Sequence, residues 1–335
     1  MMVSALSEIV DWGQTFAGVA EYREKNGTKG TNVNVAVLDS GVPKEHPDLT
    51  PNVVQAVDFT GDNRRFNPHG CHVGGIIAAA ADDRGVVGVA PEAKLHSVRV
   101  LDSDGLCPAD YSWVIQGLEW VADHREIDIV NLSLGAPIQP PDRMQSIIRS
   151  LSARGTLIVA ASGNDGSNVV SWPAKYDEVV AVAAMDKDGK IARFSNVDPS
   201  LEVVAPGVDI YSTWINGGYG YAKESGTSMS APFISGLLAL MIAYHRNGDA
   251  HETPMTNYLE AVAHLQGFQD GKLVAGLPNQ SVGVGVLNVH PMLAKEASSC
   301  SQAQAAMQTS VSGWKRRFYR WLESVARRRL LSIGG

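Results

Sequence analysis

Five short apolar runs, separated by stretches with helical spacing, constrain the fold of this chain more than any other feature. The runs span residues 33–39, 94–101, 127–134, 156–162 and 178–185. Runs that are apolar at successive positions are typical of parallel strands buried on both faces. Residues 110–124 and 142–153 have helical spacing, and residues 69–80 are apolar and rich in alanine. Strands that alternate with helices predict an α/β protein with a doubly wound, mainly parallel sheet.

The chain is long enough for one large domain, since it has 335 residues of which 44% are hydrophobic. We expect a single domain over residues 1–295, with its core at about 10–245, because the patterning weakens from about residue 246. The remaining residues, 296–335, form a polar joint and a basic tail.

The cysteines and the N-terminus bear on the cellular compartment. Cys71, Cys107 and Cys300 are too few and too irregularly spaced for a disulfide framework or a zinc site. The first residues lack the basic and apolar regions of a signal peptide, and no uninterrupted apolar run reaches the roughly 18 residues of a membrane span. We expect a cytoplasmic protein, or a secreted one if the chain is a processed mature form.

Charge is distributed unevenly along the chain. The net charge is −7, which gives no reason to expect nucleic-acid binding, yet residues 311–335 hold seven Lys and Arg against one acid, Glu323. The apolar residues of the tail recur at helical spacing: Trp314, Phe318, Trp321, Leu322 and Val325. Residues 314–330 therefore predict a basic amphipathic helix that lies on an anionic membrane or docks on a partner protein. The alternatives are a terminal helix that packs on the acidic body and a disordered tail.

Polar residues follow three of the predicted strands. Asp39 ends the first strand, Ser133 follows the apolar part of the third, and Asn164 follows the fourth. Ligands of open parallel sheets bind at the carboxyl ends of strands, so we expect the functional site at this edge.

A serine opens the longest apolar helix of the sequence. The stretch GTSMSAPFISG, residues 226–236, places Ser228 at the start of that helix. Such a serine is usually an N-cap, but it can also be a nucleophile in the positive field of the helix N-terminus. A hydroxyl nucleophile needs a base and an acid that orients the base. His69, in NPHGCHVGG, and Asp39, in VAVLDSG, would supply them.

Together these segments resemble the subtilisin family of serine proteases. The family sites read D-S/T-G, H-G-T-H-V-A-G and G-T-S-M-A-x-P in that order, and this chain has DSG, HGCHVGG and GTSMSAP. Further blocks in family order include NLSLG (131–135), ASGND (161–165) and VVAPGVDIYST (203–213). The resemblance covers about residues 10–245 and continues more weakly to about 295. It is closest in organisation to the intracellular-type bacterial subtilisins, and it implies a three-layer α/β/α fold.

The resemblance implies a serine endopeptidase. Ser228 would attack the scissile carbonyl to form an acyl-enzyme, His69 would act as general base and then general acid, and Asp39 would orient His69. Asn164 matches the side-chain donor of the oxyanion hole, although its G-N-D context also suits simple turn chemistry.

The substrates implied are extended peptides or unfolded proteins. The substrate-binding residues implied by the family are Leu101, Tyr111, Ser133, Leu134, Gly135, Ala161, Ser162, Gly163 and Ser171. Residues 133–135 would pair with the peptide as an added strand. Residues 161–163 would form a wall of the pocket for the side chain before the scissile bond, with Ser171 near its base. Leu101 and Tyr111 would border two further pockets, or be ordinary core and surface residues.

Three details accompany the match. Gly70, Gly74 and Gly75 thin the helix after His69, which would let another backbone pack closely. Cys71 stands where the family has threonine, and we expect it to be buried and inert. Trp172–Pro173 matches a peptide bond that is usually cis in the family.

The resemblance also suggests a structural calcium ion. Asp48 and Asp82 would supply carboxylate oxygens, and Ala80, Arg84 and Val86 would supply backbone carbonyls. Oxygen sets of this kind suit a hard cation. The N-terminal ligand would be Ser7 or Glu8, and the alternative is a solvated acidic turn.

Two other functions compete with this interpretation. The chain could be a catalytically silent peptide-binding or scaffold module, although the presence of Asp39, His69, Ser228 and Asn164 argues against that. It could also be a processing protease dedicated to one partner and recruited by the C-terminal helix. A dinucleotide-binding protein is excluded, because no G-x-G-x-x-G follows the first strand.

Overall fold

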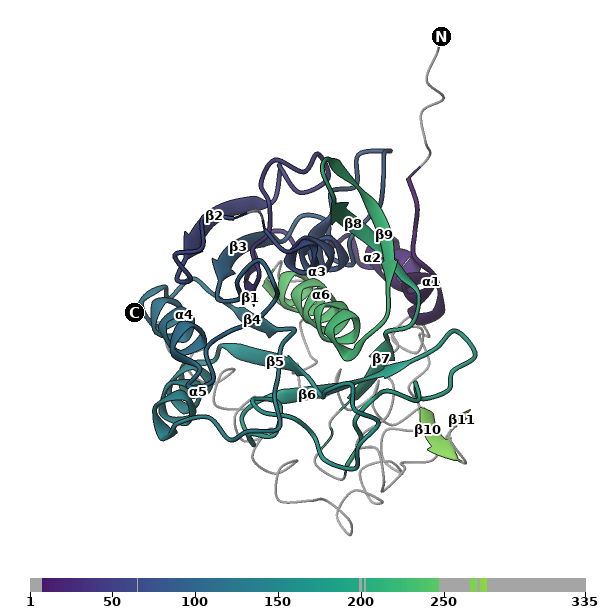
Figure 1. The fold of residues 1–335 in the computed structure, drawn as a ribbon. Coiled ribbons are helices and arrows are strands. Elements are labelled where there is room, and N and C mark those ends of the chain that lie inside the picture. Colours follow the sequence, from purple (N-terminus) through teal and green to yellow (C-terminus); the bar gives the residue numbers. More distant parts are fainter. Residues whose placement is uncertain are drawn as a thin grey trace, which may run out of the picture.

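A seven-stranded parallel sheet forms the centre of the protein. The computed structural model describes residues 8–64, 66–198, 201, 203–246, 266–269 and 272–275. The strand order is β2 (Val53–Asp58), β3 (Lys94–Arg99), β1 (Asn34–Asp39), β4 (Ile129–Leu132), β5 (Leu157–Ala161), β6 (Val180–Met185) and β7 (Val203–Pro206). Every neighbouring pair in it is parallel. The predicted sheet is confirmed, and β2 and β7 extend the five predicted strands at its two edges (Figure 1).

Helices cover both faces of this sheet, as the doubly wound pattern predicts. Successive residues of β1 point to opposite faces. Val35 and Val37 pack in one core with α1 (Trp12–Ala17), α2 (Val19–Asn26), α3 (Pro68–Ala78) and α6 (Thr227–Arg246). Ala36 and Leu38 pack in a second core with α4 (Ser112–Asp123) and α5 (Asp142–Arg154). The molecule is therefore a three-layer α/β/α sandwich (Figure 1).

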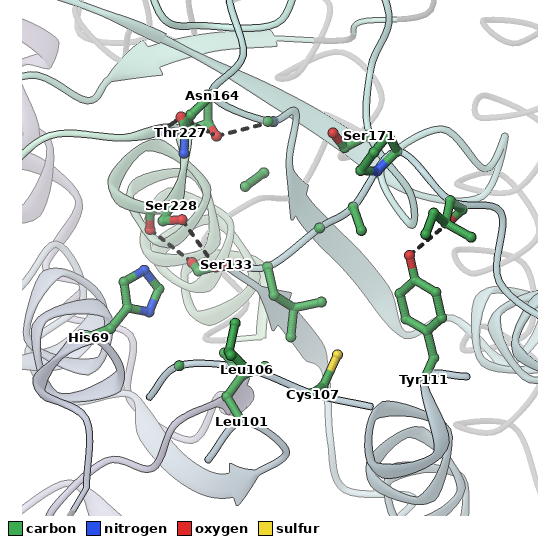
Figure 2. A pocket seen from close by; sticks show the side chains of 18 of the residues that line it. His69, Leu101, Leu106, Cys107, Tyr111, Ser133, Asn164, Ser171, Thr227 and Ser228 are labelled. Carbon is green, nitrogen blue, oxygen red and sulfur yellow. Dashed lines mark hydrogen bonds between the residues drawn. The ribbon is translucent and has the colours of Figure 1, made fainter. Parts of the chain in front are cut away.

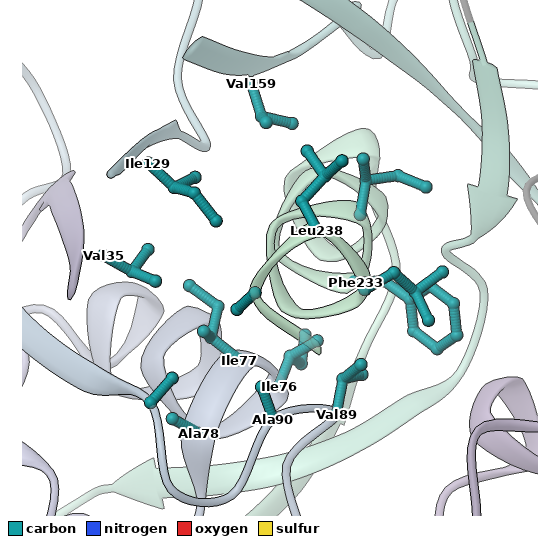
Figure 3. Close-up of a cluster of buried hydrophobic side chains, with 14 of the residues drawn as sticks. Val35, Ile76, Ile77, Ala78, Val89, Ala90, Ile129, Val159, Phe233 and Leu238 are labelled. Carbon is teal, nitrogen blue, oxygen red and sulfur yellow. The ribbon is translucent and has the colours of Figure 1, made fainter. Parts of the chain in front are cut away.

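Helix α6 is the centre of the first core. Its Phe233 and Leu238 are almost fully buried and lie among side chains from α3 and the sheet, including Ile129 and Val159 (Figure 3). Each such burial contributes about 1.5–3 kcal/mol to folding. The window Thr227–Tyr244 is long and apolar enough to cross a membrane, but 89% of it is buried inside the protein.

An antiparallel hairpin, β8 (Ile210–Ile215) and β9 (Tyr219–Glu224), packs on α3 and leads into α6. Thr213 Oγ1 donates to the carbonyl of Cys71 at 2.7 Å. A Cβ at Gly75 would lie 2.3 Å from Thr213 Oγ1, and one at Gly70 would lie 2.5 Å from the carbonyl oxygen of Gly41. The expectation that glycine lets other backbone pack against this helix is therefore confirmed at Gly70, whereas Gly74 and Gly75 make room for side chains.

A second hairpin pairs β10 (Gln266–Gln269) with β11 (Lys272–Ala275). The amphipathic helix predicted at residues 314–330, and the whole joint and tail from residue 296, lie outside the described residues.

Candidate active site

A cavity of about 570 Å³ opens at the carboxyl ends of the central strands. His69, Asn164 and Ser228 line it together, and Asp39 is the last residue of β1. Figure 2 shows His69, Asn164 and Ser228 around the cavity, and Asp39 contacts His69. The predicted edge of the sheet is therefore where the structure brings these four residues together.

Asp39 and His69 are held in direct contact. The Nδ1 atom of His69 lies 2.8 Å from Asp39 Oδ1, which also accepts from the backbone N–H of Ser40 at 2.7 Å. Asp39 is fully buried, and its Oδ2 has no hydrogen-bond partner among the described residues. His69 and the backbone N–H of Ser40 thus share one oxygen of the buried carboxylate.

The local sequence fixes where His69 points. Asn67 caps α3 by accepting the backbone N–H of His69 at 3.0 Å, and Pro68 is the first helical residue. An Asn cap followed by Pro is a favourable helix start. His69 therefore lies on the first turn of a rigid helix, with its ring partly exposed to the cavity.

Two opposing effects act on the pKa of His69. Burial lowers it, whereas the charge of Asp39, the hydrogen bond to Asp39 and the charge of Glu224 raise it. The net result is a raised pKa, because these attractions to the imidazolium together outweigh the cost of burial.

Ser228 is the second residue of α6. Its hydroxyl donates to the carbonyl of Ser133 at 3.1 Å, and the Ser133 hydroxyl donates to the carbonyl of Ser228 at 2.8 Å (Figure 2). These two bonds attach the start of α6 to the segment after β4. Catalytic hydrogen bonds are often not yet formed in the free enzyme, and a rotation of the Ser228 side chain would redirect its hydroxyl.

Asn164 reaches the start of α6 from the loop after β5. Its Oδ1 accepts from the backbone N–H of Thr227 at 2.9 Å and from Thr227 Oγ1 at 3.0 Å. Because two donors meet that oxygen, the oxygen and nitrogen of the Asn164 amide cannot be exchanged. The amide nitrogen therefore points away from Thr227. The helix is capped here by Asn164 and not by the side chain of Ser228, contrary to the simple N-cap interpretation.

The predicted substrate-binding residues line the same cavity, except for Ser162. The lining residues among them are Leu101, Tyr111, Ser133, Leu134, Gly135, Ala161, Gly163 and Ser171. Tyr111 is buried and donates to the carbonyl of Ile138 at 2.7 Å. The side chain of Ser162 is fully buried and donates to the carbonyl of Asn196 at 2.9 Å. The Ser162 side chain therefore points away from the cavity, because neighbouring side chains in an extended segment point to opposite sides.

Several cavity residues were not predicted from the sequence. Leu106 and Ile138 are 64% and 60% exposed and line the cavity together with the half-buried Cys107. Thr227 was missed as the partner of Asn164. A cysteine or an exposed leucine in a loop carries no pattern that would have identified it.

The two described cysteines are free. Cys71 is fully buried, and burial raises the pKa of its thiol to about 12. The thiolate is the reactive form, so the structure agrees with the expectation of an inert residue. The Trp172–Pro173 peptide bond is cis, as expected.

The predicted calcium ligands fit a cation in part. Glu8 Oε1 and Asp82 Oδ1 are buried carboxylate oxygens without a partner in the described chain. Glu8 adjoins Ile9, whose N–H donates to the carbonyl of Gly85 at 2.8 Å, beside the predicted loop. Against this, Asp48 already accepts from Tyr221 and Val86, and Asp82 also pairs with Arg84.

No cluster of three or more His, Cys, Asp or Glu side chains suited to a metal occurs among the described residues. Ser7, the other candidate for the N-terminal ligand, lies outside them.

Comparison with known proteins gives one consistent result. The model of the subtilase family, Peptidase_S8, matches residues 30–285. The chain is 41% identical over 227 residues to subtilisin NAT of Bacillus subtilis subsp. natto, covering 65% of this chain and 58% of that protein. It is 39% identical over 230 residues to the major intracellular serine protease of Bacillus subtilis (strain 168), covering 65% and 70%.

The intracellular serine protease of Paenibacillus polymyxa is also similar, at 39% identity over 228 residues, covering 64% of this chain and 68% of that protein. The chain thus spans less than two thirds of subtilisin NAT and slightly more than two thirds of the two intracellular proteases.

Proposed function

The chain belongs to the subtilase family, and on that premise we propose that it is a serine endopeptidase. The observation that carries the proposal is the 2.8 Å contact between Asp39 and His69 beside a cavity that His69 shares with Ser228 and Asn164. A buried acid, a histidine and a serine in one cavity suit acyl transfer. The relatives of this chain at about 40% identity include proteins named as subtilisins and serine proteases.

In the proposed mechanism, Ser228 turns from the Ser133 carbonyl to His69 and attacks the peptide carbonyl. His69 takes the serine proton and returns it to the leaving amine, while the buried carboxylate of Asp39 stabilises the imidazolium. The raised pKa of His69 is consistent with that stabilisation. The tetrahedral oxyanion would accept from the Asn164 amide and the backbone N–H of Ser228.

The proposed substrates are extended peptides and unfolded proteins. The cavity runs from Ser228 along residues 133–135, and this segment has the position to pair with a peptide strand. We propose the peptidase domain at residues 1–295, and a docking role for residues 314–330 on an anionic membrane or a partner protein. A cytoplasmic location is proposed from the names of the two intracellular relatives.

A structural calcium ion is proposed at Asp48, Asp82 and the backbone carbonyls of Ala80, Arg84 and Val86, with Glu8 as the N-terminal ligand. The support is that one carboxylate oxygen of Glu8 and one of Asp82 are buried without a partner among the described residues. A bound cation would neutralise them and stabilise the native state by mass action. Addition of calcium to the chelated protein should raise its Tm, and Asp82→Ala should remove that response. An identical Tm with and without calcium would eliminate the site.

Labelling with a fluorophosphonate probe tests the catalytic proposal. The wild type should gain one adduct by intact mass, and Ser228→Ala should gain none. Ser146→Ala, which changes an exposed serine of α5, is the matched control and should label like the wild type. A folded, calcium-loaded wild type without an adduct would refute an activated serine and would favour a silent binding module. Profiling with unfolded proteins would then separate a broad protease from one dedicated to a single site.

A further inference from the structure

Asn196 contacts the loop that carries Asn164 at several points, although it does not line the cavity itself. This loop, residues 162–171, follows β5 and supplies Gly163, Asn164 and Ser171 to the cavity lining. Asn196 comes from the segment between β6 and β7, and only 1% of its surface is exposed. The amide of a buried asparagine must form its hydrogen bonds within the protein. The partners of Asn196 therefore show which segment it stabilises.

The side-chain amide of Asn196 is used entirely within this loop. Its Oδ1 accepts from the backbone N–H groups of Asp165 and Ser167 at 2.9 and 3.0 Å. Its Nδ2 donates to Asp165 Oδ2 at 3.2 Å and to Ser171 Oγ at 3.4 Å. Backbone N–H groups can only donate, so the oxygen and nitrogen ends cannot be exchanged.

The backbone of Asn196 holds the beginning of the loop. Its N–H donates to the carbonyl of Gly163 at 2.9 Å, and its carbonyl accepts from Ser162 Oγ at 2.9 Å. A Cβ at Gly163, where φ is +107°, would lie 2.3 Å from Asn196 Nδ2. The residues on both sides of Asn164 are thus hydrogen-bonded to Asn196. The side chain of Asn164 is itself held by Thr227.

We infer that Asn196 is a positioning residue: it fixes the oxyanion donor Asn164 and the pocket wall formed by Gly163, Asp165 and Ser171. This role rests on the proposed function and adds a residue through which the site is assembled. Small displacements of a positioned catalytic group are costly, at about 10²-fold in rate for 1 Å. The amide therefore acts on both turnover and recognition of the side chain before the scissile bond.

Asn196→Asp tests this role because it keeps the shape of the side chain. It replaces the two Nδ2 donors by an acceptor that faces the Asp165 carboxylate, so the loop should be displaced. We expect kcat to fall about 10–100-fold for all peptides. KM should rise for peptides with a large apolar residue before the scissile bond and stay unchanged for peptides with glycine there. Asn216→Asp, at an exposed hairpin turn, is the matched control and should behave like the wild type.

A second change should rescue the first. In N196D/D165N, the amide is at position 165 and the carboxylate at position 196. The amide can donate to the carboxylate, which restores the hydrogen bond with its direction reversed. We expect most of kcat and KM to recover. This double variant also tests the contact if N196D alone does not fold. No recovery in a folded double variant would overturn the inference, as would N196D kinetics within twofold of wild type.

Hydrogen–deuterium exchange gives a readout that does not depend on activity. In a Ser228→Ala background, N196D should speed exchange in peptides covering residues 163–171 and leave α5 protected as before. Unchanged exchange in the loop, or a uniform increase over the whole chain, would contradict a local positioning role. The two proposals can fail separately. If the wild type does not react with fluorophosphonate but N196D still speeds exchange in residues 163–171, the proposed function is refuted and the positioning role stands.

Discussion

Acid should destabilise this protein through His72, a buried histidine that takes no part in the proposed chemistry. Its Nε2 lies 3.0 Å from the carbonyl of Ile210 and 3.2 Å from that of Ala222, so this nitrogen carries the proton of the neutral ring. Nδ1 is buried without a partner among the described residues. A second proton there would be neither solvated nor hydrogen-bonded, and burial lowers the pKa of His72 to about 4.

The direction of the effect follows from the two pKa values. The unfolded chain binds this proton near pH 6.5 and the native state near pH 4, so stability falls as the pH drops through this interval. At pH 4 the loss is about 3 kcal/mol, a large part of the roughly 5–15 kcal/mol that stabilises a native domain. His72→Gln keeps a neutral donor and removes the titration.

The assay is denaturant unfolding at a series of pH values, in a Ser228→Ala background that prevents self-digestion. The free energy of unfolding at pH 8 minus that at pH 4 should be about 3 kcal/mol smaller in His72→Gln. Comparison at pH 8, where both side chains are neutral, reports the cost of the substitution itself. Equal pH dependence in the two proteins would show that His72 is not the acid-sensitive group.

Four further outcomes are expected. Glu224→Gln removes a charge that raises the pKa of His69, so the acid limb of kcat/KM should move to lower pH; an unmoved limb would exclude that coupling. Asn164→Ala should lower kcat by about 10²–10³-fold, the scale measured for this donor in a subtilisin, with KM little changed. Cys71 should resist mercurials in the native protein, and labelling found by peptide mapping would disprove its burial. Gly163→Ala should cost more than about 1 kcal/mol in urea unfolding, because both its φ and its neighbours exclude a Cβ.

The sheet was largely predictable because its central strands are buried on both faces. Val35 and Ala36 point to opposite faces of the sheet, and both lie in a hydrophobic core. Every position of such a strand therefore needs an apolar side chain, which produces the continuous apolar runs in the sequence. The edge strand β2 has mostly exposed residues, so its run is broken by Gln55 and was missed. The β8–β9 hairpin was missed because glycines lie in and beside its strands, which is typical of a loop, whereas its cross-strand pairing and its packing on α3 are visible only in the structure.

The site shows the same division. The sequence motifs predicted Asp39, His69, Ser228 and Asn164, which the structure brings together, because the proposed chemistry needs particular residue types at particular places. Asn196 was not identified, since a polar residue in a turn-like segment looks solvent-exposed until its buried partners are seen. The direction of a single side chain in a loop, as at Ser162, depends on backbone geometry that no short motif contains.

The central position of α6 has a consequence for how the protein is made. The helix lies late in the described chain, and it contacts β4, β5, β6, β7 and α3. During synthesis, all of these elements leave the ribosome before it does. Until α6 arrives, the face of the sheet that carries Val35 and Val37 has only α1, α2 and α3 packed in its core, and the cavity lacks Ser228. The proposed nucleophile thus lies on the element that completes the described core, so a growing chain cannot gain the proposed peptidase activity before it has made this helix.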